Sequence, residues 1–315
     1  MKKPIVVLTG PTAVGKTELS IQLAKAIGGE IISADSMQVY KYMDIGSAKI
    51  TPEEMDGVRH YLVDELEPFD EFHVVKFQEY AQKYLNEIYA HEKIPIIAGG
   101  TGFYIQALLN DIDFTEQESD SAYRRELEAL AEEHGNQYLH DRLKEVDPES
   151  AEAIHPNNRK RVIRALEFYQ ETGRKISEHN AKEQMRTSPY NFAYFVLNDE
   201  RSHLYKKIDA RVDKMIEDGL EAEVRRLKEM GCTKDMVAMQ GIGYKEMLSY
   251  LDGGYSLEEA VYIIKRETRH FAKRQITWFK RERDVIWLNN NEFDYKNEAI
   301  LAYMIKILKE KAIIS

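Results

Sequence analysis

One short glycine-rich segment restricts what this chain can fold into more than any other feature. It runs from Gly10 to Thr17 and follows the pattern glycine, four variable residues, glycine, lysine, and then serine or threonine. The apolar run at 4–9 predicts a buried strand before it, and the apolar spacing over 16–27 predicts a helix after it. A strand, a glycine loop and a helix in this order are typical of a phosphate-binding loop.

The residue types in this loop indicate how it would bind phosphate. Glycine lets the backbone wrap an anion so that successive N–H groups point at its oxygens, and the following helix adds its positive end. Lys16 supplies a positive charge, and the Thr17 hydroxyl suits a Mg²⁺ ligand. The loop alone fits either a nucleoside triphosphate or a diphosphate ester. The residues predicted to hold the phosphates are Gly10, Pro11, Thr12, Ala13, Val14, Gly15, Lys16 and Thr17.

Strands and helices alternate through much of the chain, which predicts a parallel sheet covered by helices. An amphipathic helix is predicted over 74–90. The further strands are predicted at 31–32, 94–98, 192–197 and 285–288. The predicted fold class is therefore α/β, a P-loop NTPase-like parallel sheet with flanking helices.

The middle of the chain has helical patterning without a convincing strand, and we interpret 115–189 as an all-helical insertion domain. One helix in it is predicted over 161–169 and ends at Gly173. The catalytic core would then comprise 1–114 and 190–315. Its C-terminal part is predicted to hold long helices over 201–230 and 256–280 and a terminal helix in the last residues.

Composition narrows the class of protein. Hydrophobic residues make up 43% of the 315, the apolar runs are strand-sized, and we expect no membrane span and a cytoplasmic protein. A single cysteine, Cys232, excludes an internal disulfide. The formal net charge is −10, yet eight basic and only two acidic residues lie between Lys265 and Arg283. Local patches decide phosphate contacts, so RNA binding stays possible.

Asp35 stands where the second predicted strand ends. In open α/β sheets, the carboxyl ends of the strands line the ligand crevice. A carboxylate there serves as a general base or holds a metal ion through water. Position alone is equally compatible with an aspartate that caps a helix or a turn.

Six sequence blocks, in order along the chain, resemble those of the tRNA dimethylallyltransferase family in its bacterial form. Each block is weak by itself, and together they cover most of the chain. The blocks are Ser33–Tyr40, Tyr42–Lys49, His60–Asp64, Gly99–Tyr104, Asn158–Glu167 and Gln240–Glu246.

The resemblance implies transfer of a dimethylallyl group from dimethylallyl diphosphate to the N6 amine of the adenosine on the 3′ side of the anticodon, with release of diphosphate. Asp35 would accept the proton of the weakly nucleophilic amine. Lys16, the amides of the loop, Thr101 and Arg211 would stabilise the negative charge on the departing oxygen, with Mg²⁺ held by Thr17. For Arg211, position alone favours an ordinary salt bridge on a helix surface.

The resemblance also implies partners. They are the anticodon stem-loop of tRNA and dimethylallyl diphosphate, with no membrane and a monomeric protein. Base chemistry in a stacked loop requires extrusion of the base into a pocket. Trp278 and Phe279 are aromatic side chains that could stack on such a base, but we expect them to pack in the core. The implied tRNA-binding residues are Asp35, Ser36, Met37, Gln38, Thr101, Arg124, Lys160, Arg161, Val162, Ile163, Arg164, Gln240, Gly243, Tyr244, Lys245, Lys273 and Arg274.

Three alternatives share the loop. A nucleotide or small-molecule kinase would transfer phosphate from ATP, and an adenylate isopentenyltransferase would prenylate free AMP. An RNA-binding P-loop protein would do no prenyl chemistry. The basic segment 265–283 disfavours the AMP enzyme, since AMP needs no RNA-binding surface.

Overall fold

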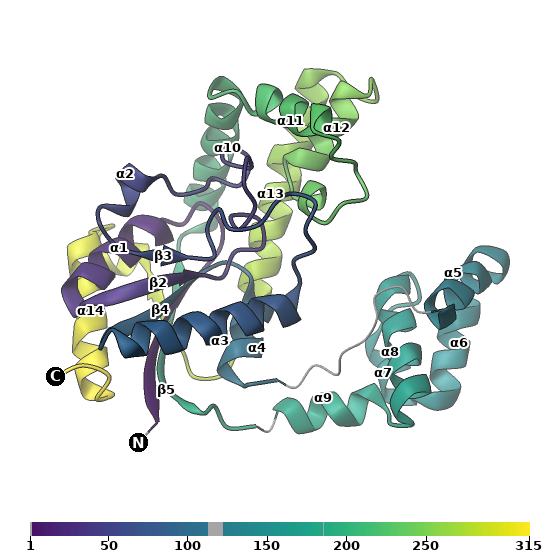
Figure 1. Cartoon of the computed structure of the whole chain (residues 1–315), viewed down its shortest axis with the longest axis horizontal. Coiled ribbons are helices and arrows are strands. Elements are labelled where there is room, and N and C mark those ends of the chain that lie inside the picture. Colours follow the sequence, from purple (N-terminus) through teal and green to yellow (C-terminus); the bar gives the residue numbers. More distant parts are fainter. Residues whose placement is uncertain (1, 113–121, 185) are drawn as a thin grey trace. The chain divides into compact units, whose positions relative to one another are not determined.

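The computed structural model describes residues 2–112, 122–184 and 186–315 (Figure 1). Backbone contacts divide the chain into two compact units. The first comprises Met1–Leu109 with Pro189–Ser315, and the second comprises Asn110–Ser188. The sequence prediction put the two boundaries at 114/115 and 189/190. No helix among the described residues is long and apolar enough to cross a membrane.

The first unit is built on a six-stranded sheet in the order β3-β2-β4-β1-β5-β6, in which every neighbouring pair is parallel. The α/β class with a P-loop-type sheet is confirmed. The strand before the glycine loop is central, because it pairs with β4 on one side and β5 on the other. The strands are β1 (Lys3–Thr9), β2 (Gly29–Ser33), β3 (His60–Tyr61), β4 (Ile94–Gly99), β5 (Tyr190–Asn198) and β6 (Val285–Asn289).

Both faces of this sheet are buried. Side chains alternate along a strand, so Ile5 and Val7 of β1 enter one core while Val6 and Leu8 enter the other. Figure 1 shows helices on both faces. The Ile5 face carries α3 (Val74–Ala90) and α4 (Gly102–Leu109), and the Val6 face carries α1 (Lys16–Ile27) and α14 (Asn297–Glu310). The predicted helices at 16–27 and 74–90 have the predicted bounds.

The C-terminal half of this unit adds α10 (Arg201–Glu217), α11 (Leu220–Glu229), α12 (Tyr244–Leu251) and α13 (Leu257–Phe279). The single helix predicted over 201–230 was wrong. Gly219 adopts φ 102°, which no α-helix contains, and the chain starts a new helix there. The helix predicted over 256–280 is confirmed as α13, which Ser256 begins with a capping box to Glu259.

The second unit has its own core and contains no strand among its described residues. Leu127, Leu143 and Val162 belong to this core and are fully buried. The predicted stop of α8 at Gly173 is confirmed by its left-handed cap. The helices are α5 (Ala122–His134), α6 (Asn136–Val146), α7 (Pro148–Ala153), α8 (Arg159–Thr172) and α9 (Ile176–Gln184).

The first unit also contains a short helix, α2 (Pro52–Met55).

Glu282, just beyond α13, is a half-buried carboxyl whose titration affects stability. Burial raises its pKa to about 7, although the nearby Trp278 indole opposes the shift. Gln106 Nε2 donates to Glu282 Oε1 at 3.3 Å. The folded protein thus keeps its proton in the range where the unfolded chain has lost it, so this group lowers stability as pH rises from its ordinary value of 4.5 through 7.

We predict that Glu282→Gln, a neutral mimic of the protonated acid, raises the melting temperature relative to wild type. The gain should be a few degrees at about pH 8 and clearly smaller at about pH 5. Thermal denaturation across that range measures it. Glu133→Gln, at a side chain that is 73% exposed, is the matched control and should give no pH-dependent gain. An equal effect of Glu282→Gln at both pH values would contradict the prediction.

Candidate active site

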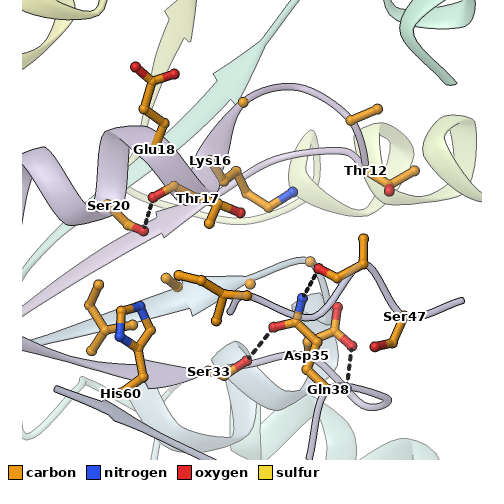
Figure 2. Close-up of a pocket in the computed structure, with 18 of the residues that line it drawn as sticks. Thr12, Lys16, Thr17, Glu18, Ser20, Ser33, Asp35, Gln38, Ser47 and His60 are labelled. Atoms are coloured by element: carbon orange, nitrogen blue, oxygen red, sulfur yellow. Dashed lines mark hydrogen bonds between the residues drawn. The ribbon is translucent and has the colours of Figure 1, made fainter. Parts of the chain in front are cut away.

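A cavity of about 280 Å³ opens at the carboxyl ends of β1, β2 and β4, where ligands bind in open α/β sheets. Figure 2 shows Lys16 and Thr17 on one side of it, with Asp35 and Gln38 facing them from the other. Helices α10 and α13 contribute Arg211 and Gln275 to its wall. Segments that are far apart in the sequence therefore meet at one site.

The glycine loop is pressed against the neighbouring strand. Gly10 has φ 146°, and a Cβ there would lie 2.2 Å from the Leu197 carbonyl oxygen. Only glycine fits this approach. Helix α1 then begins at Lys16 and aims its N-terminal end into the cavity.

The Lys16 ammonium folds back over its own loop and donates to the carbonyl oxygens of Gly10 at 3.0 Å and Pro11 at 2.8 Å. Burial lowers the pKa of Lys16 to about 7, and the nearby charge of Arg211 adds to this, while Asp35 opposes it. Arg211 reaches from α10 to within 3.5 Å of Thr12 Oγ1. No acid among the described residues pairs with Arg211, so it is not a surface salt bridge. The two cations instead make an anion-binding wall.

Asp35 follows β2 and turns the chain back on itself. Its Oδ1 accepts the N–H groups of Met37 at 2.8 Å and Gln38 at 3.3 Å. No donor among the described residues bonds Oδ2. Gln38 is held by the Ala48 carbonyl, to which its Nε2 donates at 3.1 Å. The carboxylate is thus fixed through one oxygen, and the other is available in the cavity.

Thr101 does not itself line the cavity but belongs to the turn that forms part of its wall. Its N–H donates to the Ala34 carbonyl at 3.1 Å, next to Asp35. Gly99 permits this approach, since a Cβ there would lie 2.3 Å from the Ala34 oxygen. Thr101 is therefore held close to the segment that carries Asp35, and its side chain is half-buried.

Sequence reasoning missed Gln275, which joins the two glycine-rich turns. Its Oε1 accepts the N–H of Thr12 at 2.9 Å, and its Nε2 donates to the Gly100 carbonyl at 2.9 Å. The side chain is 6% exposed. A polar residue at helical spacing between the buried Ala272 and Phe279 was the available signal, but its two partners are not deducible from the sequence.

The tRNA-binding positions predicted in the second unit divide into two groups. Lys160 and Arg161 are exposed on α8, and Arg164 is half-buried, with burial lowering its pKa. Val162 and Ile163 point into the core of that unit, so only their backbone is available to RNA. Arg124 forms a two-point ion pair with the buried Glu167, at 3.0 and 2.6 Å, which gives it a structural partner.

The positions predicted in the first unit divide similarly. Lys273 and Arg274 are exposed on α13, whereas Phe279 is buried and Trp278 packs against the core, as predicted. Tyr244 is fully buried and cannot stack on a base. Gly243 caps α12, Gln240 donates to the Lys234 carbonyl, and Lys245 is half-buried beside Glu246. Ser36 and Met37 are half-buried in the turn after Asp35.

The cavity offers oxygen ligands of the kind that Mg²⁺ prefers. The exposed Thr17 side chain lines it, and the Asp35 carboxylate faces it. The described residues contain no group of three or more His, Cys, Asp or Glu side chains able to hold a metal. The residues present therefore fit Mg²⁺, which Thr17 Oγ1 would hold.

We predict that Gln275→Met, which keeps the length but removes both hydrogen bonds, weakens binding of inorganic diphosphate with Mg²⁺. Ordering one residue of a released loop costs about 1–2 kcal/mol, so the Kd should rise about tenfold. Isothermal titration calorimetry measures it. Gln137→Met, at an exposed glutamine of α6, is the control. An unchanged Kd in Gln275→Met would show that the bridge does not organise the loop.

Comparison with known proteins gives one consistent family. The model of the family described as IPP transferase matches residues 38–282. The chain is 63% identical to a tRNA dimethylallyltransferase of Lachnoclostridium phytofermentans over 99% of both chains. It is 52% identical to a tRNA dimethylallyltransferase of Acetivibrio thermocellus, over 94% of this chain and 95% of that one.

Solved structures agree. The full-length tRNA isopentenylpyrophosphate transferase of Bacillus halodurans is 45% identical, covers 99% of this chain with 98% of its own, and has a TM-score of 0.74. A eukaryotic dimethylallyltransferase solved acting on tRNA is 32% identical, with a TM-score of 0.80 over 91% of this chain and 74% of that one. This chain belongs to the IPP transferase family.

Proposed function

We propose that this protein transfers the dimethylallyl group of dimethylallyl diphosphate to the N6 amine of the adenosine on the 3′ side of the anticodon in tRNA. One observation carries the proposal. A cationic anion-binding wall and a carboxylate with one available oxygen face each other across a single cavity. Family membership and relatives with tRNA-modifying names support the same reaction.

The donor diphosphate occupies the wall made by the glycine loop in this proposal. Lys16 exchanges its bonds to the loop carbonyls for bonds to phosphate oxygens, and the Arg211 guanidinium adds a second positive charge. As the bond between carbon and oxygen breaks, the electron pair stays on the diphosphate. Lys16, Arg211 and the loop amides stabilise that charge. Thr17 would hold Mg²⁺, which supplies further positive charge to the leaving group when bound.

The acceptor adenine occupies the side of the cavity that Asp35 and Gln38 form. An exocyclic aromatic amine is a weak nucleophile, because its lone pair is delocalised into the ring. Asp35 Oδ2 accepts the N–H proton while the nitrogen forms the new bond to the allylic carbon. The bonds of Oδ1 to the backbone hold the carboxylate in place during this step.

The RNA partner needs cationic surface outside the cavity. Lys273 and Arg274 on α13, and Lys160 and Arg161 on α8, are exposed and suit stem phosphates. The cavity suits an extruded base, since chemistry on a stacked base requires flipping. We further propose that the protein acts as a monomer, and that it acts in the cytoplasm, where tRNA is found.

The reaction is tested by incubating the protein with radiolabelled dimethylallyl diphosphate, Mg²⁺ and unmodified tRNA, with AMP in a parallel tube. We expect label in tRNA and none in AMP, because the cationic surfaces bind the stem. Label in AMP alone would assign the chain to free-nucleotide prenylation. Label in neither acceptor would exclude prenyl transfer, and phosphate transfer from labelled ATP would then identify a kinase.

The role of Asp35 is tested by Asp35→Asn. Asparagine keeps an oxygen for the Met37 and Gln38 amides but cannot take up a proton. We expect the rate of the chemical step to fall about a hundredfold or more, and the Kd values for donor and tRNA to change by no more than about threefold. Rapid-quench kinetics with separate binding titrations measure this. Asp252→Asn, at a side chain that is 57% exposed, is the control. An unchanged chemical rate would remove Asp35 from the mechanism.

A further inference from the structure

The loop Met43–Ala48 forms part of the acceptor side of the cavity but belongs to no helix or strand. Its Ser47 and Ala48 line the cavity. The Ala48 carbonyl accepts from Gln38 Nε2 at 3.1 Å, so the loop also determines where Gln38 lies. A loop without a ladder needs other partners for its backbone amides.

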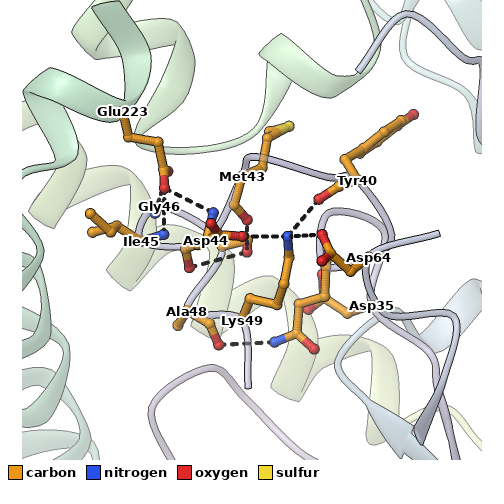
Figure 3. Close-up of polar contacts among 12 residues, drawn as sticks. Asp35, Tyr40, Met43, Asp44, Ile45, Gly46, Ala48, Lys49, Asp64 and Glu223 are labelled. Atoms are coloured by element: carbon orange, nitrogen blue, oxygen red, sulfur yellow. Dashed lines mark hydrogen bonds and ion pairs between the residues drawn. The ribbon is translucent and has the colours of Figure 1, made fainter. Parts of the chain in front are cut away.

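Those partners converge on one side chain, as Figure 3 shows. Glu223 of α11 accepts three consecutive backbone N–H groups, from Asp44 at 2.8 Å, Ile45 at 2.8 Å and Gly46 at 3.0 Å. The Tyr244 hydroxyl donates a fourth hydrogen bond, at 2.8 Å. Glu223 is 3% exposed, and no lysine or arginine among the described residues pairs with it.

These four hydrogen bonds require a carboxylate at position 223. A buried carboxylate without a cation is costly unless hydrogen bonds replace its lost water. Four donors require four acceptor sites, which a carboxylate has; glutamine would turn two N–H donors toward other donors. Burial, and then the Glu223 charge, raise the pKa of Tyr244, so its hydroxyl stays protonated and remains a donor.

The rest of the loop is equally constrained. A Cβ on Gly46 would lie 2.6 Å from the Tyr244 ring, so the loop packs directly on α12. The Lys49 side chain is 6% exposed and donates to the Tyr40 carbonyl at 2.7 Å, to Asp44 at 2.6 Å and to Asp64 at 2.8 Å. Helices α11 and α12 therefore hold this loop in place, although neither helix contributes a side chain to the cavity wall.

We propose that Glu223 is a positioning residue for the acceptor: it fixes the loop Met43–Ala48, and through the Ala48 carbonyl it orients Gln38 beside Asp35. The inference rests on the proposed function, because it assigns this side of the cavity to the RNA base. The hydrogen bonds of Glu223 go to the loop amides and to Tyr244, and none goes to the described residues of the glycine loop or to Arg211. We therefore expect Glu223→Gln to leave the donor wall in place and to act on the acceptor side.

The kinetic test compares Glu223→Gln with Glu221→Gln, at a more exposed glutamate of the same helix. With labelled donor and unmodified tRNA, we expect kcat/KM for tRNA to fall about tenfold or more in Glu223→Gln, with the KM for donor changed by less than about twofold. Tyr244→Phe removes one donor and leaves the three amides bound, so it should have a smaller effect in the same direction. Equal losses for donor and tRNA, or no loss beyond that of Glu221→Gln, would overturn the inference.

Two further measurements separate positioning from general stability. A double-mutant cycle with Gln38→Ala should be less than additive, because Glu223 acts through Gln38; additive effects would contradict this route. Amide hydrogen exchange at Asp44, Ile45 and Gly46 needs no substrate and should become faster in Glu223→Gln. Unchanged exchange would overturn the anchoring itself, whereas a wild-type protein that prenylates nothing would count against the proposed function alone.

Discussion

The site depends on how closely backbone segments approach one another at the edge of the parallel sheet. A Cβ on Gly10 would lie 2.2 Å from the Leu197 oxygen, and one on Gly99 would lie 2.3 Å from the Ala34 oxygen. Any larger residue at either position would push a turn outward. The turn after β1 carries Lys16, and the turn after β4 supports the segment of Asp35. Backbone contacts therefore fix where each of these two turns lies at the edge of the sheet.

The same closeness explains the electrostatics. Lys16 and Arg211 are brought together in one cavity, and burial lowers the pKa of both. Two like charges there are unfavourable until an anion arrives. Lys16 meanwhile bonds to the carbonyls of its own loop, which satisfies the ammonium without neutralising it. A bound diphosphate would relieve this repulsion. Part of the binding free energy therefore comes from removing an unfavourable interaction that is present in the ligand-free protein.

The sequence predicted local features well and long-range partners poorly. The glycine loop, Asp35 and Arg211 were identified, and the structure brings all three to one cavity. Gln275 and Glu223 were missed because their partners are distant in the sequence. The amide that Gln275 binds lies 263 residues away, and the first amide that Glu223 binds lies 179 residues away. The break at Gly219 was overlooked because helical periodicity continues on both sides of it. Resemblance also marked Tyr244 without indicating that its ring is buried.

The charge pattern of α13 shows why counting residues overestimates an RNA-binding surface. Lys265 pairs with Asp213, Arg269 with Asp209, and Arg266 with its neighbour Glu267. The first half of the basic segment is therefore largely neutralised by acids of α10 and of α13 itself. No acid among the described residues pairs with Lys273 or Arg274, which are exposed further along. Positive potential is then concentrated toward the end of α13, whose Gln275 lies in the cavity wall. An acidic protein can thus still present a polyanion with unpaired positive charge, here on the part of α13 that carries Lys273 and Arg274.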